Sequence, residues 1–359
     1  MSTTSATGAG VDRRRAVVLT LVAVVVAVIG LSWAKWLPYS DRVAGIAGSG
    51  TYPGKSILGT GAGDGAFGRA WEFTVAYSLA VWKALLAAMV IAACVDVLVP
   101  RRWLLRALGR RSPVGGSLAG GVAALPGMMC TCCTAPLAVT MRRAGVPVPA
   151  ALAFWLGNPV LNPAVLVFLG LLAPGSWVVV RVVLGVLLVF GFSALVGHLV
   201  SRRTAGPGGD LPAADRAVAA AADEPLAWGE IPGRLLRSFA RLAVVLVPEY
   251  LLVVFLVALF SAPLGRVLGH GGLVAVLVAA VVGTVLVLPT GGEIPILLGL
   301  AAAGASAGVL GALLIALPAV SLPSAVMVGR AFGWRVTAAT AGATVAAGLL
   351  AGGLLTALS

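Results

Sequence analysis

Long apolar stretches separated by short polar segments dominate the hydrophobic pattern of this chain. The longest apolar stretches cover residues 16–34, 71–99, 147–173, 176–200, 235–260 and 336–358. An α-helix needs about 20 predominantly apolar residues to cross the roughly 30 Å hydrocarbon core of a bilayer. These stretches therefore predict membrane-spanning helices, and the expected fold is an all-α polytopic membrane protein.

Shorter apolar pieces occur in two pairs. Residues 114–126 and 130–141 form the first pair, which Pro126 and Gly127 separate. The second pair lies within residues 271–303 and is interrupted by Pro289-Thr290-Gly291-Gly292-Glu293-Ile294-Pro295. Because most of these pieces are too short to span a bilayer alone, each pair predicts a re-entrant or broken-helix hairpin. Two short spans are the alternative for each pair.

Two longer segments are broken in the middle, and the breaks match. Asn158-Pro159-Val160-Leu161-Asn162-Pro163 interrupts the first segment, and Pro318-Ala319-Val320-Ser321-Leu322-Pro323 interrupts the second. The halves share further positions, the last of them after one inserted residue: Pro136 with Pro295, Gly145 with Gly304, Pro159 with Pro318, and Pro163 with Pro323. Breaks in corresponding positions predict an internal repeat and point to a midplane binding site.

Arginine runs predict the orientation of the two repeats. Arg101 to Arg111 follow the first long span of one half, whereas Arg234, Arg237 and Arg241 precede that of the other. Basic loops remain in the cytoplasm under the positive-inside rule, so these spans are expected to cross in opposite directions. The repeats are therefore predicted to be inverted, as in many secondary transporters with alternating access.

The pattern divides the chain into five parts: an N-terminal transmembrane helix (1–37), an extracytoplasmic loop (38–70), a first repeat (71–200), a cytoplasmic linker (201–233) and a second repeat (234–359). Arg13 to Arg15 predict a cytoplasmic N-terminus, and Trp33, Trp36 and Tyr39 fit an interfacial aromatic belt. The whole chain is expected to hold about seven full spans plus two hairpins.

Composition and charge exclude several classes of protein. Apolar residues occupy 60% of the 359 positions and charged residues only 10%, against about 25% in a soluble domain. The net charge of +13 comes from arginines between apolar stretches without an aromatic-interleaved basic face, which argues against nucleic-acid binding. The cysteine spacing does not resemble a secreted disulfide framework. No G-x-x-x-x-G-K-[ST] motif is present, and no cofactor is expected.

The strongest candidate site is the run Cys130-Thr131-Cys132-Cys133 in the predicted tip of the first hairpin. Thiolates are soft ligands, and three of them on a non-helical turn can converge on a thiophilic centre such as Cu(I) or trivalent arsenic. The alternative is that these cysteines are small apolar residues that let helices approach closely. That packing role is the favoured interpretation for the isolated Cys94.

Two acidic residues lie inside apolar regions. Glu293 occupies the break of the second half, and Glu249 lies mid-span after Pro248. A carboxylate at membrane depth usually faces a cavity or a partner, so both are candidates for proton coupling. The alternative role for Glu293 is a cap on a helix N-terminus. An ion pair between Lys83 and Glu249 is geometrically possible. Arg181, near a predicted span end, is expected to snorkel to the headgroups.

Asn158, Asn162 and Ser321 supply uncharged polar groups at the two broken helices. Side-chain amides and freed backbone groups at such breaks can hold a solute or an ion. These three residues are therefore candidate substrate ligands. Satisfying the interrupted helix backbone is the alternative role.

Two longer runs resemble the signatures of a family of predicted permeases that includes YraQ-type proteins and the ArsP organoarsenical exporters. The runs are PGMMCTCCTAPLAVTMRRAGVPVPAALAFWLGNPVLNPAVLVF and LPTGGEIPILLGLAAAGASAGVLGALLIALPAVSLPSAVMVGRAFG. Cys130, Cys132 and Pro136 match the Cys-x-Cys and Pro of the first signature, whereas Cys133 is an addition. Glu293 and the Pro-x-x-Ser-Leu-Pro break match the second. The resemblance implies a permease, with trivalent organoarsenical export as one known activity of the family.

We therefore expect a multi-pass permease of the bacterial inner membrane that moves a small soft or thiophilic solute. Efflux of trivalent organoarsenicals, and hence arsenic resistance, is the specific hypothesis. The expected partners are the lipid bilayer and a small-molecule or metalloid solute, and a homo-oligomer is left open.

Two alternatives to that permease remain. One is a permease or channel for another small sulfur-containing or neutral solute, in which the cysteines only pack. The other is an intramembrane cysteine enzyme. An enzyme would need a base beside the thiol, but the histidines, His198 and His270, lie near predicted span ends.

Overall fold

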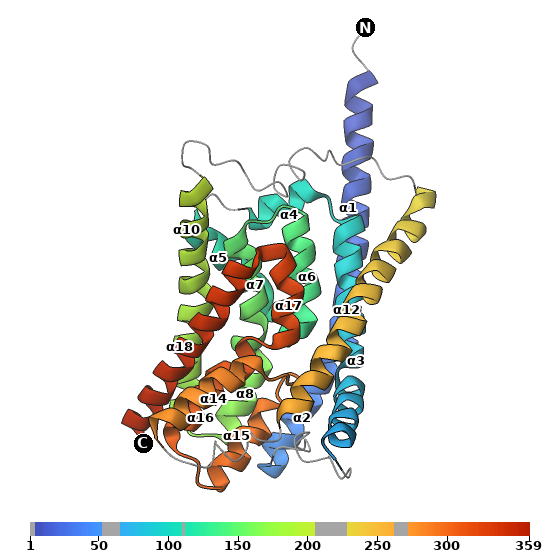
Figure 1. The fold of residues 1–359 in the computed structure, drawn as a ribbon. Coiled ribbons are helices and arrows are strands. Elements are labelled where there is room, and N and C mark those ends of the chain that lie inside the picture. Colours follow the sequence, from blue (N-terminus) through green and yellow to red (C-terminus); the bar gives the residue numbers. More distant parts are fainter. Residues whose placement is uncertain (1–3, 52–64, 110–111, 205–227, 262–271) are drawn as a thin grey trace.

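The chain folds into a bundle of α-helices (Figure 1), and the described residues contain no strand. The computed structural model describes residues 4–51, 65–109, 112–204, 228–261 and 272–359. Within these ranges, six helices are long and apolar enough to cross a membrane, and a seventh is added if one bent pair counts as a single span. The expected all-α polytopic architecture is therefore confirmed.

The N-terminal segment is helical well beyond the predicted first span. Helix α1 (Thr4–Leu31) continues through a π-helical turn, Ser32–Trp36, into α2 (Leu37–Ser49). Residues 38–49 were predicted to lie in a loop, but they stay helical because Tyr39 and Ile46 are buried against α8. Residues 52–64 of the predicted loop lie outside the described residues.

The first half contains the helices that follow: α3 (Ala66–Leu98), α4 (Arg101–Leu108), α5 (Pro113–Ala124), α6 (Thr131–Arg143), α7 (Val148–Val160), α8 (Pro163–Leu172), α9 (Gly175–Val186) and α10 (Ser193–Thr204). Short α5 and α6 are separated by a 3-10 turn, Leu125–Gly127, and by Met128 with its positive φ of 48°. Helices α7 and α8 together count as one span, as do α9 and α10.

The second half contains α12 (Ile231–Ser261), α14 (Leu273–Val285), α15 (Glu293–Ala302), α16 (Ala307–Ala319), α17 (Leu322–Phe332) and α18 (Trp334–Leu358). Helices α16 and α17 are bent by 50° at the predicted break. Most of the predicted linker, residues 205–227, lies outside the described residues, and its last residues, from Ile231, already belong to α12.

Helix boundaries repeat between the halves at a constant spacing. Helix α7 begins at 148 and α16 at 307, while α8 begins at 163 and α17 at 322, an offset of 159 residues in both cases. The same offset relates Gly145 and Gly304, which both adopt a positive φ, of 92° and 82°, between consecutive helices. By this offset Asn162 corresponds to Ser321, and Pro163 corresponds to Leu322. The two helices therefore begin in register, and Pro323 lies one position further along α17 than Pro163 does along α8.

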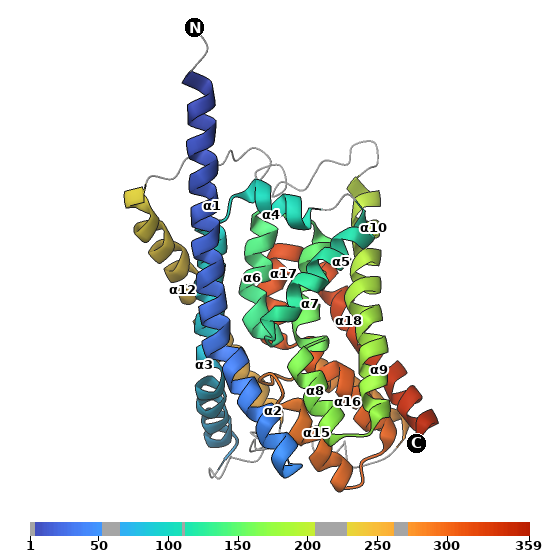
Figure 2. The same cartoon turned by 180° about the vertical axis from the view of Figure 1, so that it is seen from behind.

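The two short-helix pairs lie toward opposite ends of the bundle. Figures 1 and 2 place α5 and α6 near α4, and α14 and α15 toward the opposite end with α2. Helices α3 and α12 pack side by side and run in opposite directions. The α7–α8 span is the most enclosed, with 83% of its apolar window buried against 17% for the N-terminal helix. The centre of the protein is therefore built around α7 and α8.

Candidate functional site

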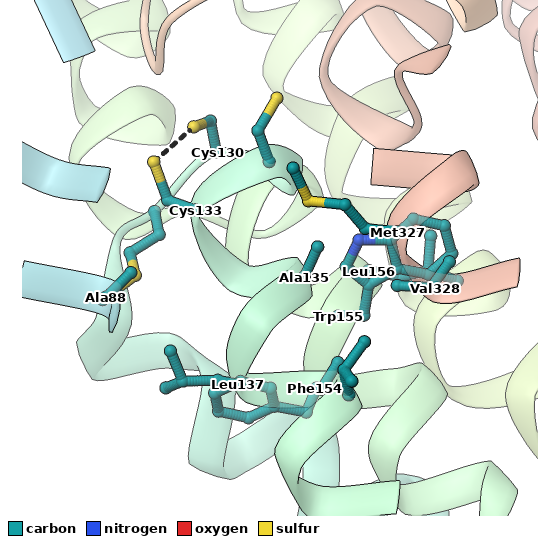
Figure 3. Close-up of a cluster of buried hydrophobic side chains, with 14 of the residues drawn as sticks. Ala88, Cys130, Cys133, Ala135, Leu137, Phe154, Trp155, Leu156, Met327 and Val328 are labelled. Carbon is teal, nitrogen blue, oxygen red and sulfur yellow. Dashed lines mark hydrogen bonds between the residues drawn. The ribbon is translucent and has the colours of Figure 1, made fainter. Parts of the chain in front are cut away.

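The cysteine run lies at the start of α6, where the hairpin turns back. Cys130 has an extended backbone, and α6 begins at the next residue. Cys130, Cys132 and Cys133 are all buried. The sulfur atoms of Cys130 and Cys133 are 3.0 Å apart and approach each other beside Ala88 of α3 (Figure 3). This spacing places the two thiols on one side of the first turn of α6, since residues three apart are neighbours on a helix.

Cys132 points to the other half of the protein. Its sulfur lies 3.4 Å from the Ser321 hydroxyl oxygen, which is also 3.1 Å from the hydroxyl oxygen of Thr131. Ser321 is the N-cap residue of α17 and forms a capping box with Ser324. The tip of the first hairpin therefore meets the broken helix of the second half.

The three thiols do not share one centre in this structure. Among the described residues, no group of three His, Cys, Asp or Glu side chains is positioned to hold a metal ion. Cys132 interacts with the Cys130 side chain as well as with the Ser321 hydroxyl, so it lies between the Cys130–Cys133 pair and the second half of the protein. Cys94 is packed with Leu19 and Ala23 of α1, in agreement with a packing role.

Asn158 and Asn162 are both buried and both bind backbone. The Asn158 side-chain oxygen accepts from Met129 N at 3.4 Å, and its amide donates to Phe154 O at 3.0 Å. The Asn162 oxygen caps α8 by accepting from the first two free N–H groups, at 3.1 and 3.3 Å. These contacts show the backbone role for both residues. Of the polar atoms of these two side chains, the Asn162 nitrogen is the one without a hydrogen-bond partner among the described residues.

Arg181 does not snorkel, contrary to expectation. Its side chain is fully buried, and Nη2 lies 3.0 Å from Oε1 of Glu293. The guanidinium also donates to Pro159 O at 3.1 Å and Val160 O at 3.2 Å. The break after α7 leaves these carbonyls without helical donors, which explains why a cation is stable there. A single arginine inside the apolar range 176–200 was the sequence signal for this role.

Glu249 pairs with Arg330 instead of Lys83. The Glu249 carboxylate lies 3.6 Å from the Arg330 guanidinium. Both line a cavity of about 200 Å³ between α6, α12 and α17, which Arg142, Arg143 and Arg241 also line. The Lys83 ammonium instead lies over the rings of Trp33 and Trp82.

The sequence analysis missed Lys35. This residue is buried in the π-helical turn, and its ammonium donates to the Tyr39 hydroxyl at 3.3 Å and to the Thr290 hydroxyl at 3.2 Å. Tyr39 in turn donates to Met128 O at the hairpin tip, so it does not belong to an interfacial belt. The ammonium is within electrostatic range of Cys130 and Cys133. A lone lysine in an apolar stretch was the available signal.

Two tyrosine hydroxyls add polar groups to the same buried region. Tyr77 of α3 and Tyr250 of α12 have ring centroids 5.9 Å apart and belong to the cluster that contains the three cysteines. The Tyr77 side chain also interacts with Cys132 and with Tyr250, so the two phenols belong to the polar surroundings of the cysteine run.

Comparison with known proteins identifies a family that this chain matches. A family model named ArsP_1 and described as a predicted permease matches residues 66–357. The UPF0718 protein YraQ of Escherichia coli (strain K12) is 38% identical over 334 residues, which cover 92% of each chain. No solved structure matches the chain.

Proposed function

Because the chain belongs to the family of predicted permeases that matches residues 66–357, we propose that this multi-pass membrane protein moves a small soft or thiophilic solute. The thiols at the tip of the first hairpin would engage the solute. One observation carries the proposal: the buried Cys132 thiol lies 3.4 Å from Ser321 of the other half. The thiols are therefore located where two interrupted helices meet, which is the usual place for a transporter binding site.

The Cys130–Cys133 pair suits a solute with two exchangeable ligands. For a trivalent methylarsenical with two hydroxyl groups, two As–S bonds form and two As–O bonds break. Each thiol proton leaves with a hydroxyl group as water, and the oxidation state of arsenic does not change. The reverse reaction releases the solute. Cys132 is the third soft ligand, and it would receive the solute on the side of Ser321.

Alternating access is the proposed mechanism, and the repeated helix boundaries and the opposite placement of the two short-helix pairs support it. In such transporters inverted repeats rock around a fixed central site. Most arginine runs lie toward the α4 end, which would be cytoplasmic under the positive-inside rule. The N-terminus would then be cytoplasmic, and the membrane would be the bacterial inner membrane.

The Arg181–Glu293 pair would couple protons to this movement. Arg181 belongs to α9 of the first half and Glu293 to α15 of the second, so their ion pair joins the halves beside the break. Protonation of Glu293 would remove the negative charge and loosen that connection. Glu249 would act similarly on Arg330, at the wall of the smaller cavity.

Transport by everted membrane vesicles tests the proposal. Vesicles containing the protein are expected to accumulate a trivalent methylarsenical but not its pentavalent form. Cys130→Ser/Cys133→Ser should abolish accumulation, whereas the matched control Cys94→Ser should keep it. Equal accumulation by the double variant would show that the cysteines only pack. Failure of the wild-type protein to move the trivalent form would overturn the arsenical hypothesis.

The enzyme alternative has less support than transport. His198 is exposed on α10, and no hydrogen bond joins it to a cysteine in the described part of the chain. His270 lies outside the described residues. A thiol nucleophile needs a base within hydrogen-bond reach, and the contacts of Cys130, Cys132 and Cys133 described above include no histidine.

A further inference from the structure

A second cavity lies between the N-terminal helix, α3 and the break before α15. Its volume is about 450 Å³, and its lining includes Lys35, Arg42, Trp82, Lys83, Thr290 and Gly292. Lys35 and Tyr39 line its buried end, and the Tyr39 hydroxyl donates to Met128 O, two residues before Cys130. The cavity is large enough for a small solute together with water.

The charged residues that line this cavity are all cationic. Lys35, Arg42 and Lys83 line it, and no Asp or Glu is among the lining residues. None of these three cations forms an ion pair within the described part of the chain. Glu293 follows the lining residue Gly292, but its carboxylate is engaged 3.0 Å from Arg181. Buried charges are normally paired, yet in the described ranges the Lys35 ammonium contacts two hydroxyls and the Tyr39 ring and no carboxylate.

We propose that this cavity binds a small anion with a soft, sulfur-bearing end, and that such an anion is the cargo of the permease. The proposal rests on the permease function proposed above, but it makes the soft solute an anion in place of the neutral methylarsenical. The Lys35 ammonium binds the anionic end, while Arg42 and Lys83 attract the anion to the exposed part of the cavity. The soft end then faces Cys130 and Cys133, and no covalent step is required.

The cavity at the other end of the bundle has the same sign. Arg142, Arg143, Arg241 and Arg330 line it together with one carboxylate, Glu249. Positive charge at both cavities suits the passage of an anion, because charged clefts concentrate ligands of opposite sign. The positive-inside rule explains the arginines near α4. It does not explain Lys35, Arg42 and Lys83 toward the α2 end, which gives those residues a separate role.

Calorimetric titration of the purified full-length protein in detergent tests the proposal. Thiosulfate and sulfate are the probes, because they share charge and shape and differ by one terminal sulfur. Thiosulfate is expected to bind more tightly than sulfate. Lys35→Met should weaken thiosulfate binding by about tenfold or more, the effect of losing a charged hydrogen bond. Lys35→Arg should retain binding, which separates loss of charge from misfolding.

Two exposed arginines provide a matched comparison. Arg42→Gln should weaken binding because Arg42 lines the cavity, whereas Arg69→Gln should not, since Arg69 lies on α3 outside the lining. No thiosulfate binding by the wild-type protein, or equal binding by Lys35→Met, would overturn the proposal. Equal affinity for thiosulfate and sulfate would refute the claim that the site prefers an anion with a soft, sulfur-bearing end.

The outcomes also separate this inference from the proposed function. Cysteine-dependent transport of the neutral trivalent methylarsenical, without any thiosulfate binding, would keep the thiol-based function and refute the anionic cargo. Lys35-dependent thiosulfate binding, together with transport that is indifferent to the cysteines, would support the anion site and refute the role of the thiols.

Discussion

Removal of the Arg181 guanidinium should lower the free energy of unfolding by about 3–5 kcal/mol. Arg181 is fully buried, lies 3.0 Å from Glu293 and donates to two carbonyl oxygens. The Arg181→Met variant therefore loses the counter-charge of a buried carboxylate and the donors of two buried acceptors. The uncompensated charge is the largest single cost, because each unsatisfied neutral group costs about 1–3 kcal/mol.

Removing both charges should be less damaging than removing Arg181 alone. In Arg181→Met/Glu293→Leu, no charge remains buried, and the main loss is that of donors for Pro159 O and Val160 O. Both variants lose these two donors, at about 1–3 kcal/mol for each acceptor, but the double variant avoids the cost of an unpaired buried carboxylate and should be the more stable of the two. The single Glu293→Leu variant, which leaves the Arg181 charge unpaired, completes the set, whereas Glu293→Gln keeps an acceptor for Arg181 and should be milder than either single variant.

Unfolding in mixed micelles with increasing sodium dodecyl sulfate, followed by circular dichroism, measures these differences as a double-mutant cycle. Arg234→Met is the matched control, because Arg234 pairs with Glu230 at 3.1 Å on the exposed surface. Exposed pairs contribute little, so this variant should unfold like wild type. If the double variant is destabilised by the sum of the two single effects, the pair is not coupled and the reasoning is wrong.

Three further predictions follow from packing, capping and topology. Gly352→Ala should destabilise the protein by about 1–3 kcal/mol, because its Cβ would lie 2.6 Å from Gly308 O. Gly353→Ala has open space and should be neutral or stabilising in the same titration. Equal effects of the two variants would contradict the close approach of Gly352 to Gly308. Asn162→Ala should cost about 1 kcal/mol through loss of the α8 cap, and Asn162→Ser should restore most of it; no cost for alanine would refute the capping role. Impermeant maleimides should label Arg143→Cys and Ala303→Cys from opposite membrane faces if the repeats are inverted, and labelling from one face would refute inversion.

The broken helices could be predicted because local chemistry creates them. Pro159 and Pro318 lack the N–H that a helix interior needs, and Gly145 and Gly304 permit the positive φ between helices. These residues predicted the repeat, and the helix boundaries agree with it. The cysteine run does lie beside the turn of the first hairpin, but only Cys130 precedes α6; Cys132 and Cys133 lie in the first turn of that helix and not on the predicted non-helical turn.

The pairings could not be predicted, because they join residues far apart in the chain. Arg181 and Glu293 are separated by 112 positions, and Lys35 and Thr290 by 255. Hydropathy shows that Arg181 and Lys35 are unusual within apolar stretches but not which partner each one meets. Aromatic content near a span end suggested an interface for Tyr39, whereas packing against Phe168 buries it. Tertiary contacts decide these cases.

The most direct test of the central claim asks whether the buried thiols lie on a path that opens to both sides. Cys130, Cys132 and Cys133 are kept in a Cys94→Ser background, and an impermeant maleimide is applied to right-side-out and to everted vesicles. The account predicts labelling from each face during turnover and protection by a trivalent methylarsenical. Absence of labelling from both faces would contradict it, because thiols that remain buried throughout transport only pack the helices.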